Sequence, residues 1–209
     1  MNYAHEREEI VRYGGLLYEK TLVIGKSGNI SVRKGDVMLI TPSGSCKGLL
    51  NENDIIEVDI ASGSVIGKGK PSIETPFHLA FYRERPDVNA VVHCHPMFCT
   101  VMAVAGVGLE TGLTPEALMV LGREVPMIPY ATPGTEYLAN MLRQSLGTAV
   151  SFILEKHGAI AVGGTMKEAF HRMETLEFMA ELQYHLMKLG KVEPLPYNEV
   201  ERILSMSKH

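Results

Sequence analysis

The sequence predicts an α/β protein in which helices cover both faces of a mainly antiparallel or mixed sheet. Segments with the two-residue period of strands and segments with helical spacing are mixed along the chain without strict alternation. Several pairs of predicted strands are separated by only a few residues, too few for the crossover that joins parallel neighbours. The chain has 209 residues, 45% of them hydrophobic and 21% charged, which is enough for a sizeable core. We therefore expect one domain over residues 1–209, with a C-terminal tail at 197–209.

The N-terminal half is predicted to begin with a helix over residues 4–20, because apolar residues fall on or near one face. A glycine-containing turn at 25–28 ends this helix. A second helix is expected over 74–85, with Pro76 in the first turn, where a missing N–H loses no partner. Short strands bounded by Gly, Pro and Ser are expected between the two helices, at residues 29–33, 37–41 and 55–59.

The C-terminal half is dominated by a long helix predicted over residues 166–189, where apolar residues such as Phe170 and Met173 recur at spacings of three and four. Gly190 ends it, and a short terminal helix is expected after residue 196. The other elements expected in this half are strands at 88–93, 124–129, 150–154 and 159–162, and helices at 97–105 and 136–146.

Charge and cysteine content exclude several classes of protein. The formal net charge is −4, and no run of Lys and Arg is longer than a pair, which argues against a nucleic-acid partner or an anionic membrane surface. The longest apolar run falls far short of the roughly 18 residues of a membrane span, and the charged N-terminus is unlike a signal peptide. The three cysteines, Cys46, Cys94 and Cys99, form no CxxC pair and suit a reducing compartment. We therefore expect a cytoplasmic protein without a nucleic-acid or membrane partner.

Three histidines mark a candidate metal site. His93 and His95 stand at the end of a predicted strand, and the two-residue period of a strand points both imidazoles to the same face. His157 ends another predicted strand, and Gly158 after it leaves the backbone room to present the ring. Three imidazoles leave a fourth position open on a tetrahedral ion, as in catalytic zinc sites. The alternative is three ordinary packed histidines, since His-x-His also occurs by chance; Cys94 is expected on the opposite face of the strand, in the core.

A carboxylate and several turn residues could complete such a site. Glu74 stands at a loop-to-helix junction 19 residues before His93, where it could cap the helix or act as a ligand or general acid/base near a metal. We interpret His78 as a helix-face residue, or as one that contacts the site residues without binding the metal itself. Backbone N–H groups and hydroxyls in turns can cradle a phosphate, although such clusters are usually plain turns. The turn residues in question are Lys26, Gly28, Asn29, Ser43, Gly44 and Ser72.

Taken in order, these motifs resemble those of the class II aldolase/adducin-head family over about residues 5–190. The resemblance implies a three-layer α/β/α fold with a mostly antiparallel sheet. It also implies a homotetramer of fourfold symmetry with active sites between subunits. The motifs that carry it are Gly28-Asn29-Ile30-Ser31, Thr41-Pro42-Ser43-Gly44, Pro71-Ser72-Ile73-Glu74, His93-Cys94-His95, Pro129-Tyr130-Ala131 with Gly134-Thr135, and His157-Gly158.

The resemblance further implies a metal-dependent aldolase that reversibly cleaves a phosphorylated sugar. The sugar is a ketose 1-phosphate of the fuculose or 5-deoxypentulose type, and the products are dihydroxyacetone phosphate and a short aldehyde. The metal is zinc, or alternatively manganese, cobalt or iron, and stabilises the carbanion left by carbon–carbon cleavage. By position, His93, His95 and His157 match the metal ligands, and Glu74 matches the catalytic carboxylate that also approaches the resting metal. The positions that match the phosphate site are Asn29, Ser43, Gly44 and Ser72.

Three departures from the family pattern concern the substrate. Ile73 stands where a second phosphate-binding serine is usual, and Lys26 stands where a threonine is usual and could supply the missing contact. The tyrosine that donates a proton from the neighbouring subunit has no match, and Glu116 is the titratable group in the corresponding stretch, 113–117. Lys156 replaces an amide residue that often precedes the third histidine. Because of these changes, the resemblance does not specify which aldehyde is the product.

Other activities remain as alternatives. Relatives with the same ligands act as pentulose-phosphate epimerases, as dehydratases of a methylthio-sugar phosphate or as decarboxylases of sugar-acid phosphates. The epimerases usually carry aspartate where Glu74 stands, which favours an aldolase. A non-enzymatic interaction domain, as in the adducin head, has commonly lost the metal ligands, whereas all three are present in this chain.

Overall fold

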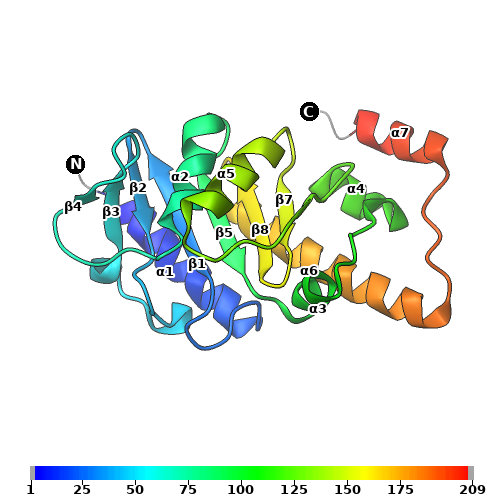
Figure 1. The fold of residues 1–209 in the computed structure, drawn as a ribbon, viewed down its shortest axis with the longest axis horizontal. Coiled ribbons are helices and arrows are strands. Elements are labelled where there is room, and N and C mark those ends of the chain that lie inside the picture. The colour runs from blue at the N-terminus through cyan, green and yellow to red at the C-terminus, as the bar shows by residue number, and fades with distance from the viewer. Residues whose placement is uncertain (1–2, 207–209) are drawn as a thin grey trace.

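A single sheet lies between two layers of helices in the computed structural model of the chain, which describes residues 3–206 (Figure 1). This arrangement confirms the predicted three-layer α/β/α fold. Within the described range, no helix is long and apolar enough to cross a membrane.

The central layer is an eight-stranded sheet in the order β4-β3-β2-β1-β5-β8-β7-β6. Neighbouring strands in the described range pair antiparallel, except that β6 pairs parallel with β7. The prediction of a mostly antiparallel sheet is therefore confirmed. The strands are β1 (Asn29–Lys34), β2 (Val37–Ile40), β3 (Ile56–Asp59), β4 (Val65–Ile66), β5 (Ala90–Cys94), β6 (Met127–Ile128), β7 (Ser151–Leu154) and β8 (Gly158–Gly163).

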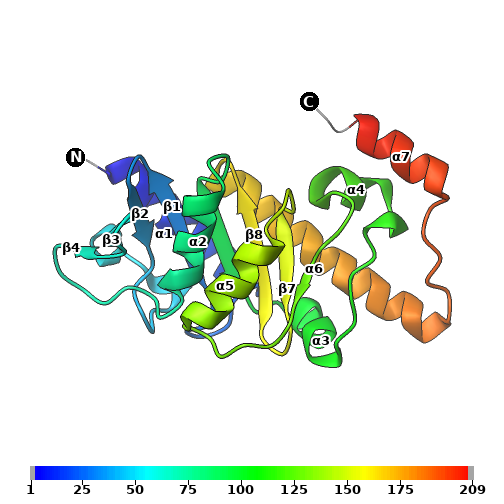
Figure 2. The same ribbon diagram turned by 45° about the horizontal axis from the view of Figure 1, so that its top comes forward.

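Helices α2 and α5 cover one face of the sheet, and α1, α3 and α6 cover the other (Figures 1 and 2). Each helix layer encloses its own apolar cluster. The α-helices are α1 (Ala4–Glu19), α2 (Thr75–Glu84), α3 (Met97–Ala105), α4 (Pro115–Leu121), α5 (Glu136–Ser145), α6 (Met166–Leu189) and α7 (Tyr197–Met206), and the 3-10 helices are η1 (Lys47–Leu49), η2 (Glu52–Asp54) and η3 (Thr111–Leu113).

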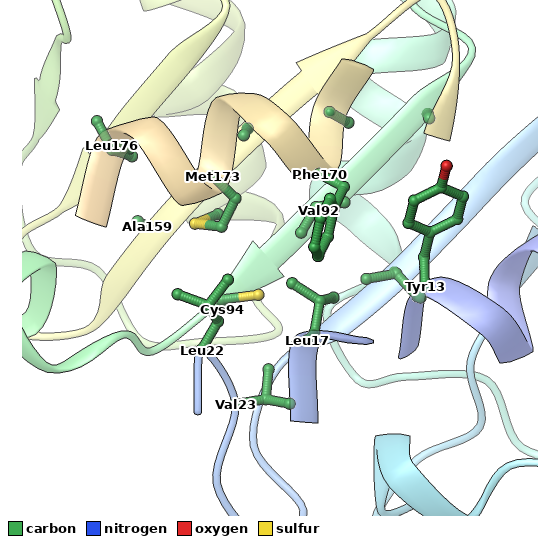
Figure 3. Packing of buried hydrophobic residues seen from close by; sticks show 14 of the residues in the cluster. Tyr13, Leu17, Leu22, Val23, Val92, Cys94, Ala159, Phe170, Met173 and Leu176 are labelled. Carbon is green, nitrogen blue, oxygen red and sulfur yellow. The ribbon is translucent and has the colours of Figure 1, made fainter. Parts of the chain in front are cut away.

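Strand β5 divides its side chains between the two faces, as the two-residue period requires. Val91 packs in the cluster under α2, and the ring of His93 meets Phe77 of α2 edge-on at 5.5 Å between centroids. Cys94 lies in the other cluster, together with Leu22 and with Met173 from α6 (Figure 3). The expectation that Cys94 is a core residue on the opposite face from the histidine is confirmed.

The C-terminal helices extend beyond the sheet. Helix α6 ends at Leu189 with Gly190 in a left-handed conformation, φ +66°, as predicted for this stop. An extended segment then leads to α7, which lies beside α4 in both views (Figures 1 and 2). Arg123 after α4 forms an ion pair with Glu201 of α7. The predicted terminal helix is therefore present in the tail 197–209, and residues 207–209 of that tail lie outside the described residues.

Several predicted element boundaries are wrong. The strand expected at 124–129 is reduced to β6, because Pro126 and Pro129 bracket Met127 and Ile128 and cannot donate to a ladder. The strand expected at 88–93 is Ala90–Cys94. Helix α4 was not predicted, although Thr114 accepts a hydrogen bond from the N–H of Ala117 and Pro115 follows it, which is a normal helix start. Strand β4 and the three 3-10 helices were not predicted either.

The buried position of Cys94 generates a stability prediction. Replacing it with serine puts a hydroxyl into an apolar cluster, and we expect the free energy of unfolding in urea to fall by about 1–3 kcal/mol. Zinc uptake by the folded protein should be unchanged, because the side chain faces away from the histidines. Cys46→Ser, at a half-buried cysteine outside the cluster, is the matched control and should retain near-wild-type stability. Loss of zinc from Cys94→Ser would place the thiol at the metal instead.

Candidate metal and substrate site

Three imidazoles converge at one end of the central strands. His93 lies in β5, and His95 follows that strand. His157 lies in the turn between β7 and β8, so the expectation that it ends a strand is wrong, because β7 already ends at Leu154. One nitrogen from each ring lies within 4.8 Å of the others, and Nε2 of His93 is 3.0 Å from Nε2 of His95. The structure therefore brings together the three histidines that the sequence singled out.

A hydrogen bond orients the His93 ring, and burial favours the neutral forms of His95 and His157. The Nδ1–H of His93 donates to the carbonyl oxygen of Ala159 at 2.9 Å, which leaves its Nε2 free to accept. Burial, and then the neighbouring His93, lower the pKa of His95 to about 3 and that of His157 to about 4. Both rings are therefore neutral near pH 7 and can bind a cation.

The Glu74 carboxylate points into the same cluster. Its Oε2 is 3.2 Å from Nε2 of His93, and its Oε1 is 3.5 Å from Nε2 of His157. Nδ2 of Asn29 donates to Oε2 at 2.7 Å. Glu74 is the residue before α2, yet its side chain makes no capping hydrogen bond; its own N–H is instead bound by Ser72 Oγ at 3.2 Å. The carboxylate thus faces the imidazoles and does not cap the helix.

Glu74 is an anion in a buried place. Burial by itself would raise the pKa of its carboxyl, but His93, His157 and the Asn29 amide outweigh burial and hold that pKa well below its usual range. Oε1 is buried without a hydrogen-bond partner. A buried polar atom in that condition normally costs stability unless a ligand or ion satisfies it.

The donor set fits a divalent transition-metal ion. One nitrogen from each of the three imidazoles lies within 4.8 Å of the others, and the oxygens of Glu74, one of them without a hydrogen-bond partner, lie 3.2 Å and 3.5 Å from two of these rings. Zinc is bound by these ligand types, and manganese, cobalt and iron accept them as well. His93, His95, His157 and Glu74 are the residues that would hold the ion.

Two glycines allow the chain to close around this cluster. Gly28 has φ +69°, and a Cβ there would lie 2.6 Å from the carbonyl oxygen of His93. At Gly158, a Cβ would lie 2.5 Å from the carbonyl oxygen of Cys94 and 2.7 Å from the His95 ring. Any side chain at these positions would push apart β1, β5 and β8. The expectation that Gly158 provides room beside the histidines is confirmed.

A small polar cavity of about 230 Å³ adjoins the imidazoles. Its wall contains all the residues that the sequence assigned to a phosphate site, together with two of the histidines and Glu74. Ile73, which replaces a serine in the family pattern, lines it as well. The lining residues are Lys26, Ser27, Gly28, Asn29, Pro42, Ser43, Gly44, Lys47, Ser72, Ile73, Glu74, His95, Pro133 and His157.

Lys47 lines this cavity, although the sequence analysis did not predict a role for it. Only 2% of it is exposed, and its Nζ donates to the carbonyl oxygens of Ser45 at 2.6 Å and Lys26 at 3.4 Å. Burial lowers the pKa of its ammonium group. The pattern Ser45-Cys46-Lys47-Gly48 carries no signal of burial, because lysines in turns are ordinarily exposed.

Glu116 lies elsewhere in the chain. It stands in the first turn of α4 and lines a different cavity, formed with residues of α6 such as His171, Glu174 and Phe178. The structure does not bring Glu116 to the imidazoles of its own chain. His171 and His185 are exposed on α6.

The comparisons with known proteins agree in pointing to one family. Residues 8–184 match the family described as Class II Aldolase and Adducin N-terminal domain. An L-fuculose phosphate aldolase from Methanococcus vannielii is 41% identical over 184 residues, covering 88% of this chain and 98% of the relative. A 5-methylthioribulose-1-phosphate/5-deoxyribulose-1-phosphate aldolase from Rhodospirillum rubrum is 39% identical over 184 residues, covering 88% and 82%.

Two further matches bear on fold and reaction. A solved L-fuculose 1-phosphate aldolase superposes with a TM-score of 0.93 at 31% identity, covering 100% of this chain and 99% of that one. A 3-oxo-tetronate 4-phosphate decarboxylase from Pectobacterium atrosepticum is 34% identical over 186 residues, covering 86% of this chain and 84% of the relative.

The depressed pKa values generate a prediction about acid stability of the metal-free protein. Unfolded histidines take up protons below about pH 6.5, whereas folded His95 and His157 stay neutral until about pH 3 and about pH 4. Their contribution to stability is therefore complete above about pH 6.5 and is lost as the pH falls. Removing one such group with His157→Gln should make the dependence shallower by up to about 1.4 kcal/mol per pH unit.

Urea unfolding in the presence of a chelator, at a series of pH values between about 4 and 7, measures this slope. Leu142→Ala, in the buried cluster under α5, is the control: it should lower stability at every pH without changing the slope. Equal slopes for wild type and His157→Gln would show that the folded ring titrates normally.

Proposed function

The chain belongs to the class II aldolase and adducin N-terminal domain family, and on that premise we propose that it is a metal-dependent aldolase. The reaction is the reversible cleavage of a ketose 1-phosphate, fuculose 1-phosphate-like or 5-deoxypentulose 1-phosphate-like, into dihydroxyacetone phosphate and a short aldehyde. The observation that carries the proposal is the convergence of Glu74 with three imidazoles beside a polar cavity.

In this proposal His93, His95 and His157 hold the ion, with Glu74 as a further ligand in the resting state. When bound, the metal, which we propose to be zinc with manganese, cobalt or iron as alternatives, supplies a positive charge that stabilises the carbanion left by carbon–carbon cleavage. Neutral imidazoles suit this role because they leave the charge of the ion undiminished. The Ala159 carbonyl supports it by keeping the His93 proton on Nδ1.

Glu74 is proposed to carry the proton to and from the donor carbon. Its Oε2 is held by Asn29, whereas its Oε1 has no hydrogen-bond partner and so remains available to a substrate proton. A general base must be ionised before it acts, and the lowered pKa of Glu74 meets that requirement in the metal-free protein.

The cavity is proposed to receive the phosphate. Ser72 Oγ accepts from the Glu74 N–H, so its own O–H can donate to an anion. Ser43 and Gly44 line the same cavity as Asn29 and are proposed to donate to the phosphate through the hydroxyl and the backbone N–H. Lys47 donates two N–H groups to carbonyls, and a lysine has three, so one remains for the phosphate. Lys26 adds a second positive charge at the cavity.

The remaining family expectations are proposals too. A homotetramer with sites between subunits would explain why Glu116 lies far from the imidazoles of its own chain, because a neighbour could supply it. We propose a single domain over residues 1–209 and a cytoplasmic location.

A decarboxylase is the second candidate. It is favoured by the relative of that name, 34% identical to this chain. Loss of carbon dioxide from a 3-oxo acid also leaves a carbanion beside a carbonyl, so the same metal and cavity would serve it. Release of carbon dioxide from a phosphorylated 3-oxo acid, without cleavage of ketose 1-phosphates, would favour this candidate.

Proton exchange at dihydroxyacetone phosphate alone tests the proposal, because this part of the reaction does not require the aldehyde to be identified. Zinc- or manganese-loaded protein with dihydroxyacetone phosphate in heavy water should exchange one C3 proton stereospecifically, as followed by proton NMR. Glu74→Gln keeps the size of the side chain but cannot accept the proton, so exchange should slow by about 100-fold or more. Metal content, measured in parallel, should stay near wild type. A Glu74→Gln variant that binds metal and exchanges at the full rate would exclude the proposed role of Glu74.

Lys47 generates a separate prediction about substrate binding. Lys47→Met keeps the apolar stem but removes the charge, and we expect KM for the phosphorylated donor to rise by about 10–100-fold with a smaller change in kcat. Lys26→Met is the comparison variant from the same cavity, and its effect should be smaller because Lys26 is exposed. An unchanged KM in Lys47→Met would remove this lysine from the phosphate site.

A further inference from the structure

A row of buried polar side chains leads from Glu74 into the apolar layer between the sheet and α2. Asn29 Nδ2 lies 2.7 Å from Glu74 Oε2, and Asn29 Oδ1 lies 2.6 Å from Nε2 of His78. Nδ1 of His78 lies 2.7 Å from Ser31 Oγ, which lies 2.7 Å from the hydroxyl of Tyr82. All five residues are buried, and His78 is fully so.

The Glu74 carboxylate determines which group donates and which accepts in each hydrogen bond of this row. An ionised Glu74 only accepts hydrogen bonds, so the nitrogen of the Asn29 amide must face it and the amide oxygen must face His78. His78 must then donate from Nε2. Burial lowers the pKa of His78 to about 3, so the ring is neutral and its Nδ1 can only accept. Ser31 therefore donates to Nδ1, and Tyr82 donates to Ser31.

The surroundings of His78 show why its two nitrogens matter. Its ring stacks on Phe77, with 4.6 Å between centroids, in a layer otherwise filled with apolar side chains. An apolar residue of similar volume would satisfy that packing. However, only a side chain with a hydrogen-bond donor at the position of Nε2 can also satisfy the amide oxygen of Asn29.

We propose that His78 is a positioning residue that orients the Asn29 amide and, through it, the Glu74 carboxylate. This inference rests on the proposed role of Glu74. With the amide so oriented, one N–H holds Oε2, and the second N–H of the same nitrogen is left for the substrate, since Asn29 also lines the cavity. With the amide reversed, its oxygen would repel the carboxylate and the substrate would lose a donor.

Two amide variants of His78 separate positioning from packing. The amide nitrogen of a glutamine reaches the place of Nε2 and can donate to Asn29, whereas the shorter asparagine reaches only the place of Nδ1, beside Ser31. Both replacements remove the ring and put a polar amide in the same buried space. If His78 acts by positioning, His78→Gln should keep kcat within about 5-fold of wild type, and His78→Asn should lose about 10–100-fold in kcat.

The assay is the exchange of the C3 proton of dihydroxyacetone phosphate by metal-loaded protein, with saturation curves that separate kcat from KM. Leu142→Ala, in the same apolar cluster but on α5 and outside the row, should be less stable with an unchanged kcat. Equal kcat values for the two His78 variants would overturn the proposal, because packing alone would then explain the residue.

A second measurement uses only the wild-type protein, so it does not depend on whether a variant folds. In wild-type protein, ¹⁵N NMR should show His78 protonated at Nε2 and bare at Nδ1, unchanged from about pH 5 to about pH 8. The opposite tautomer would overturn the proposal. If wild-type protein exchanges no C3 proton, the proposed function fails instead, and the tautomer still decides whether Asn29 is oriented as we infer.

Discussion

The pairing of β5 with β1 on one side and β8 on the other is the constraint on which the site depends. Asn29 of β1 lies opposite His93, and His93 lies opposite Ile160 of β8. This register places the Asn29 amide, the His93 ring and the turn that carries His157 at one end of adjacent strands. A shift of one residue in either pairing would turn these side chains to the opposite face. Gly28 and Gly158 permit the close approach, because side chains at these positions would meet backbone oxygens of β5.

The same register creates an electrostatic conflict that a cation would relieve. Two imidazoles with depressed pKa values and a buried carboxylate are held together, and one carboxylate oxygen has no partner. Buried polar groups arranged in this way destabilise a fold unless something binds between them. The hydrogen bonds from the Glu74 N–H to Ser72 Oγ and from the His93 Nδ1–H to the Ala159 carbonyl oxygen hold these residues in place. These buried groups therefore lower the stability of the fold, but they provide a site whose ligands are already oriented.

The parts of this site that the sequence predicted are those that follow from local rules. The two-residue period of a strand placed His93 and His95 together and Cys94 in the core, whereas His157 was expected at the end of a strand and lies in the turn after β7. The ordered motifs added Glu74 and the cavity residues. The buried position of Lys47 could not be predicted, because it arises from the packing of a 3-10 helix rather than from any periodic pattern. For His78 the sequence suggested a supporting place, but its partners Asn29 and Ser31 come from a strand more than 40 residues away. Glu116 was named from its position in the family pattern, but the structure places it on α4 beside a different cavity.

A crystal structure of the zinc-loaded protein with dihydroxyacetone phosphate would test the account most directly. The account predicts an anomalous zinc signal at about 2.0–2.1 Å from one nitrogen of each of His93, His95 and His157. It also predicts a phosphate in contact with Ser43, Ser72 and Lys47. Zinc bound away from the three imidazoles, or a phosphate bound outside this cavity, would contradict it.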